Sequence, residues 1–219
     1  MPPSPAGRPL LRGWSHVVAI APATAAATLL VLNGPHGAAQ RAALALYGAA
    51  LILLFTVSAL YHRGPWTPRV RAVWRRLDHA NIFLMIAATY TATGVIILSG
   101  TTRIAILLAV WIAATTGIVL SVLPIQLPRA VNVLLYLITG WIAIVVLPVI
   151  VPRVSTTALI FMLAGGAVYS LGALVYGFRR PRLWPSVFGY HEVFHLLVIA
   201  ATALFFAFVV LVAEPHARV

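Results

Sequence analysis

The sequence predicts an all-α membrane protein with seven transmembrane helices, its N-terminus in the cytoplasm and its C-terminus outside. Hydrophobic residues make up 62% of the 219 residues and charged residues only 8%, whereas a soluble domain carries about a quarter charged residues. Seven apolar runs are each long enough to cross roughly 30 Å of hydrocarbon. Because lipid offers no hydrogen-bond partner to an exposed backbone, we expect each run to be a helix.

The seven predicted helices follow one another with short connections. They cover residues 14–33, 42–62, 78–99, 103–123, 130–150, 155–177 and 188–213. Proline and glycine interrupt helices, and they mark the connections at Asn33-Gly34-Pro35, Gly64-Pro65, Pro124 with Pro128, Pro152, and Pro181 with Pro185. We expect a Pro-rich cytoplasmic segment at 1–13, one seven-helix domain at 14–213 and a short external tail at 214–219.

Arginines set the predicted orientation. Of the 15 arginines, 11 precede the first helix or follow the second, fourth and sixth, and the other 4 lie on the opposite side. Cytoplasmic loops carry the excess of positive residues, so we expect an integral protein of the bacterial cytoplasmic (inner) membrane. The net charge of +12 then indicates membrane lipids as partners, through anionic headgroups, and not nucleic acid. The chain has no cysteine, which excludes disulfides and thiolate metal ligands.

Polar residues gather at the predicted cytoplasmic ends of three helices. Ser58 and His62 end the second helix, Asp78 and His79 begin the third, and the seventh begins with His191, Glu192 and His195. Because alternate helices cross the membrane in opposite directions, all of these residues lie at one depth. Ionisable residues in membrane helices are costly and usually functional, so we predict a functional site at this depth.

The histidines favour a zinc site. His191 and His195 are four residues apart, so both imidazoles project from one helix face about 6 Å apart at Cβ. With His62 they make a three-histidine set that leaves a fourth position for water, which is the arrangement of catalytic Zn²⁺. Asp78 is then placed to act as general base on that water, and Ser58 to orient it or to donate to a developing oxyanion.

Simpler interpretations exist for the other four histidines, for Asp78 and for Glu192. His16, His36, His79 and His216 are expected to be interfacial histidines without a role in the site. Asp78 has Arg75 and Arg76 as possible ion-pair partners. Glu192 points about 100° away from His191 on the helix, so it is free to bond a loop arginine or a group behind the ligands.

Residues 191–195 also read as HExxH, the zinc-protease motif in which the glutamate is the base. Intramembrane metalloproteases carry this motif on a membrane helix, although the chain shows no separate peptide-binding segment. Haem is disfavoured, because two histidines one turn apart on one helix cannot occupy both axial positions of one haem.

Three ordered motifs resemble those of the hemolysin III family, which is grouped with the progestin and adiponectin receptors and with alkaline ceramidases. They are Ser58-Ala59-Leu60-Tyr61-His62, Asp78-His79-Ala80-Asn81-Ile82 with Thr89-Tyr90-Thr91, and His191-Glu192-Val193-Phe194-His195. The resemblance implies a seven-helix fold, zinc held by His62, His191 and His195, and Asp78 and Ser58 as polar partners of the metal-bound water. The chain departs from the family pattern at Ala88 and Ala92, and its N-terminal motif is reduced to Ser15-His16 without an acidic residue.

Besides the HExxH metalloprotease, three functions remain open at this point. The leading one is a zinc-dependent hydrolase of a lipid amide or ester bond, linked to membrane lipid homeostasis. The second is a non-enzymatic receptor or regulator with a structural zinc, which a fourth protein ligand would favour. The third is an ion or proton conductance, which would need a continuous polar path across the membrane.

Overall fold

The protein is an all-helical bundle, which confirms the predicted fold class. The computed structural model describes residues 9–35, 37–125, 127–184 and 186–214. Seven helical segments among them are long and apolar enough to cross a membrane. The predicted terminal segments 1–13 and 214–219 are described only at residues 9–13 and 214; their other residues, and Pro185 of the last connection, lie outside the described residues.

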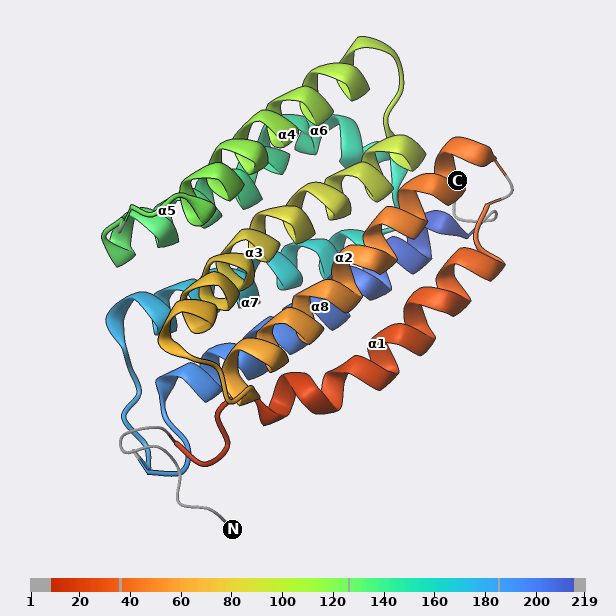
Figure 1. Ribbon diagram of the computed structural model, residues 1–219. Coiled ribbons are helices and arrows are strands. Elements are labelled where there is room, and N and C mark those ends of the chain that lie inside the picture. The colour runs from red at the N-terminus through yellow and green to blue at the C-terminus, as the bar shows by residue number, and fades with distance from the viewer. Residues whose placement is uncertain (1–8, 36, 126, 185, 215–219) are drawn as a thin grey trace.

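Six of the seven spans are single helices. They are α1 (Trp14–Asn33), α2 (Ala38–Arg63), α3 (Pro68–Ile97), α4 (Gly100–Val122), α7 (Thr156–Phe178) and α8 (Tyr190–Ala213). Helices adjacent in sequence pack together in the pairs α1–α2, α2–α3, α3–α4 and α7–α8. In addition, α1 and α3 each contact both α2 and α8. The start of α1, the end of α2 and the starts of α3 and α8 therefore meet at one end of the bundle (Figure 1).

The third helix is longer than the sequence predicted. It begins at Pro68 and not at residue 78. The side chain of Thr67 caps it by accepting a hydrogen bond from the Val70 N–H, and Pro68 occupies the first position, where a missing N–H costs nothing. Hydropathy does not detect these turns because they carry arginines. Asp78 consequently lies inside a helix, at a fixed position, and not at a helix start.

The fifth span is broken. It consists of α5 (Arg129–Trp141), the 3₁₀ segment η1 (Ile142–Val146), the short α6 (Leu147–Ile150) and the 3₁₀ turn η2 (Val151–Arg153). Pro148 lacks a backbone N–H and its ring crowds the carbonyl of Ile144, which disrupts an α-helix at this point. Pro152, expected in a connection, acts in the same way within η2.

A tyrosine hydroxyl forms hydrogen bonds with the backbone at the break. Tyr90 of α3 donates a hydrogen bond to the Gly140 carbonyl (2.7 Å) and accepts one from the Ala143 N–H (2.6 Å). Backbone groups inside a membrane need a partner within the protein. Tyr90 therefore stabilises the break by pairing two backbone groups that would otherwise lack a hydrogen-bond partner within the membrane.

Candidate metal site

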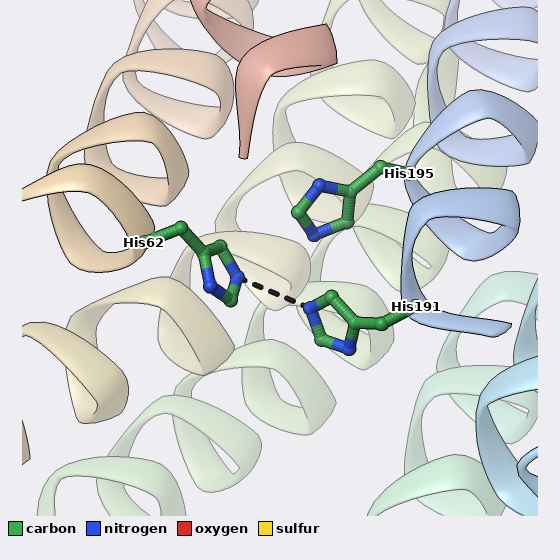
Figure 2. Close-up of side chains that lie close together, drawn as sticks. All are labelled: His62, His191 and His195. Carbon is green, nitrogen blue, oxygen red and sulfur yellow. Dashed lines mark hydrogen bonds between the residues drawn. The ribbon is translucent and has the colours of Figure 1, made fainter. Parts of the chain in front are cut away.

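Three histidines from two helices converge at the end of the bundle where α2 ends and α8 begins. His62 lies in the last turn of α2, and His191 and His195 lie in the first two turns of α8. One ring nitrogen from each lies within 4.8 Å of the others, and the three rings face one another (Figure 2). The structure thus brings together the three residues that the sequence predicted as ligands.

The three side chains fit a metal ion. Nitrogens held tetrahedrally at roughly 2.0–2.1 Å from Zn²⁺ lie about 3.4 Å apart, and the Nε2 atoms of His62 and His191 are 3.1 Å apart. In Figure 2 a ring nitrogen of His195 is directed toward His62 and His191. The group is therefore able to hold a metal ion.

Asp78 and Ser58 lie at the same end of the bundle as this group. Ser58 is one turn before His62 on the same face of α2, and its side chain lies near the Asp78 carboxyl group. Asp78 lines the same cavity as His191. Its carboxylate lies 3.9 Å from Nδ1 of His79, and within the described residues no ion pair joins it to Arg75 or Arg76.

Tyr176 of α7 is a polar residue of the site that sequence reasoning missed. Its hydroxyl lies 3.3 Å from Nε2 of His79, and Arg129 stacks on its ring, with Cζ 4.8 Å from the ring centroid. Tyr176, His79 and Asp78 all line one cavity, so His79 is part of the site and not only interfacial. Helix α7 is apolar and contains both Tyr169 and Tyr176, and nothing in the sequence distinguishes Tyr176 for this role.

Glu192 is engaged away from the three ligands. One carboxylate oxygen accepts a hydrogen bond from Arg12, and the other accepts one from the Gly189 N–H (2.7 Å). Glu192 therefore caps its own helix and pairs with a loop arginine, one of the two options left open by the sequence.

His16 is buried, so the expectation that it is interfacial is wrong. It is 3% exposed, and its ring is stacked on that of His195, with centroids 4.0 Å apart and an interplanar angle of 8°. The other two histidines expected at an interface, His36 and His216, lie outside the described residues.

An apolar cavity of about 430 Å³ adjoins the site. Its polar end is formed by Asp78, His79, Tyr136, Tyr176 and His191. From there it follows α3 as far as Ile97, and its remaining lining is almost entirely apolar. At 1.5 Å per residue, the part of α3 from Asp78 to Ile97 is roughly 28 Å long. The cavity thus extends along most of a membrane span.

The fold and the site define an integral membrane protein of seven helices, in which a histidine group able to hold a metal ion adjoins an intramembrane apolar cavity. The sequence is similar to those of known proteins. A family model described as "Haemolysin-III related" matches residues 6–206. The chain belongs to this family.

Two curated relatives are similar over most of their lengths. Hemolysin-3 of Bacillus cereus is 30% identical over 190 residues, which cover 86% of this chain and 84% of the relative. A hemolysin-3 homolog of Bacillus subtilis (strain 168) is 26% identical over 179 residues, 81% of each chain. The resemblance inferred from the three motifs is confirmed.

Proposed function

We propose that the protein is a zinc-dependent hydrolase that cleaves an amide or ester bond of a membrane lipid and serves membrane lipid homeostasis. One observation carries the proposal: the polar groups of the site stand at the end of an apolar cavity that extends along most of a membrane span. A hydrolase of acyl lipids needs both features, reactive groups at the scissile bond and an apolar volume for the chain.

The donor set favours zinc among the metals. Three neutral imidazoles suit Zn²⁺ better than Mg²⁺ or Ca²⁺, which prefer oxygen. Three protein ligands, with no fourth among the described residues, match catalytic rather than structural zinc sites. When bound, zinc polarises a carbonyl oxygen and promotes ionisation of water near neutral pH.

Asp78 and Ser58 supply the proton chemistry. The Asp78 carboxylate takes the proton of the attacking water as the new C–O bond forms. It returns that proton to the leaving nitrogen or oxygen as the C–N or C–O bond breaks, so that an acid and an amine or alcohol are released. Ser58, whose side chain lies near the Asp78 carboxyl group, is placed to orient Asp78 for both transfers.

The rest of the cavity suits the substrate's other parts. Tyr176 presents a hydroxyl at the polar end, where it can donate a hydrogen bond to the substrate carbonyl. The apolar length beyond it accepts an acyl chain, because burial of methylene groups away from water is favourable. With the arginine bias as a guide to orientation, the site opens toward the cytoplasmic leaflet.

The test uses purified, zinc-loaded protein in detergent with fluorescent ceramides and phospholipids. We expect release of the fatty acid that stops on chelation and returns with zinc. Asp78→Ala should lower the rate about 10²–10⁴-fold. Glu214→Gln is the matched control, because Glu214 is one of only three acidic residues and lies at the opposite end of α8.

Two results would contradict the proposal. One is hydrolysis that persists without metal, and the other is an Asp78→Ala variant as active as the control.

A further inference from the structure

The segment that precedes and begins α1 crosses the metal site. Its backbone is joined to the α7–α8 connection by two hydrogen bonds, from Leu10 N–H to the Ser186 carbonyl (3.0 Å) and from Leu11 N–H to the Val187 carbonyl (3.2 Å). These contacts hold residues 9–13 against the loop that leads into the ligand-bearing turns of α8.

Arg12 then forms an ion pair with Glu192. The Glu192 side chain is only 3% exposed and that of Arg12 is 20% exposed. Removal of one partner of a buried ion pair strongly destabilises the fold, because the other charge is left buried without compensation. Glu192 follows His191 directly in the sequence, so the ion pair holds the backbone of the first ligand on α8.

The same segment contacts the ligand on α2. Gly13 has a φ of 80°, in the left-handed region that favours glycine. A Cβ at this position would lie 2.5 Å from Cβ of His62. The backbone of Gly13 therefore packs directly on His62.

His16 contacts the third ligand, His195, by stacking of the two imidazole rings. A metal bound by an imidazole lies near the plane of that ring, along the nitrogen lone pair. The rings of His16 and His195 are nearly parallel at 4.0 Å, so the in-plane nitrogen lone pairs of the two rings do not converge on one point. In this arrangement His16 is not a fourth ligand; it restricts the rotation of the His195 ring.

We propose that residues 9–16, called here the N-terminal brace, hold the three ligands in place and retain the metal, with Arg12 and His16 as positioning residues. The inference rests on the metal site of the proposed function. The brace contacts His62 on α2 and His195 on α8, and through Glu192 it contacts the residue next to His191. Loss of either positioning residue leaves the ligands present but less well oriented, which typically costs roughly 10–100-fold in metal affinity.

The experiment measures zinc release from the full-length protein in lipid nanodiscs, by transfer to a chromophoric chelator. Arg12→Ala and His16→Ala should release zinc at least 10-fold faster than the unmodified protein. Arg69→Ala is the matched control, because it removes an exposed arginine near the same end of the bundle. Arg12→Glu combined with Glu192→Arg restores an ion pair and should recover most of the retention that either single change loses.

His16→Phe separates positioning from ligation. Phenylalanine keeps a stacking ring but has no nitrogen, so it should retain zinc far longer than His16→Ala and leave the visible spectrum of the Co²⁺-substituted protein unchanged. If His16→Phe and His16→Ala both changed the Co²⁺ spectrum in the same way, His16 would be a ligand and its positioning role would be overturned.

The two proposals fail in different ways. If the unmodified protein binds no zinc, the metal site itself is wrong. If it binds zinc and all variants release it at the rate of Arg69→Ala, the brace is wrong while the metal site stands.

Discussion

The hydroxyl of Tyr90 offers a sharp test of how the broken fifth span is stabilised. Tyr90→Phe removes one oxygen and leaves the Gly140 carbonyl and the Ala143 N–H without their partner. A polar group left unpaired and out of contact with water costs about 1–3 kcal/mol, so the two groups set an upper limit of about 6 kcal/mol. Side-chain hydrogen bonds between membrane helices average roughly 0.6 kcal/mol, which sets a lower limit near 1 kcal/mol. We expect a loss of about 2–3 kcal/mol.

Tyr136→Phe is the matched control. Tyr136 lines the same cavity, and its buried hydroxyl has no hydrogen-bond partner among the described residues. Its removal leaves no other group unpaired, so it should not lower the free energy of unfolding. Reversible unfolding in mixed micelles measures both variants, and amide hydrogen exchange at residues 140–147 should increase only in Tyr90→Phe. Equal stability of the two variants would refute the role given to the Tyr90 hydroxyl.

Three further predictions concern the site and the topology. His191→Ala should lower the zinc content of the purified protein below one-tenth, by elemental analysis, whereas His79→Ala should keep it; equal zinc in both would remove His191 from the ligand set. Glu192→Gln should release zinc faster through the weakened brace yet hydrolyse lipid at close to the normal rate when zinc is saturating; loss of activity there, with Asp78→Ala active, would favour the HExxH interpretation. Single cysteines at residues 5 and 217, both outside the described residues, should be labelled from the cytoplasm and from outside respectively; labelling of both from one side would contradict the seven-span topology.

Much of the candidate site is predictable from the sequence, for a simple reason. Helices that cross a membrane in alternation return their ends to the same depth, so His62 near the end of α2 and His191 near the start of α8 had to lie at one level. The four-residue spacing of His191 and His195 fixes their common face. Together these constraints select the three candidate ligands without knowledge of how the helices pack.

The remaining site residues depend on packing between helices. Tyr176 and Arg12 carry no motif, and their roles follow from contacts with His79 and Glu192, which are 97 and 180 positions distant. His16 has the sequence context of an interfacial histidine, and only the approach of α1 to α8 places its ring on His195. Hydropathy and spacing report the depth of a residue in the membrane, but not which helix it faces.

The sequence by itself determined the fold class, the seven spans and the depth of the polar groups, because apolar length and helical periodicity are local properties of the chain. The tertiary structure decided which polar groups meet. It decided that Asp78 lies within α3, that the fifth span breaks around Pro148 against Tyr90, and that the N-terminal segment covers the histidines. Each of these depends on contacts between segments far apart in the chain, and such contacts follow from how side-chain volumes fit together rather than from any local pattern.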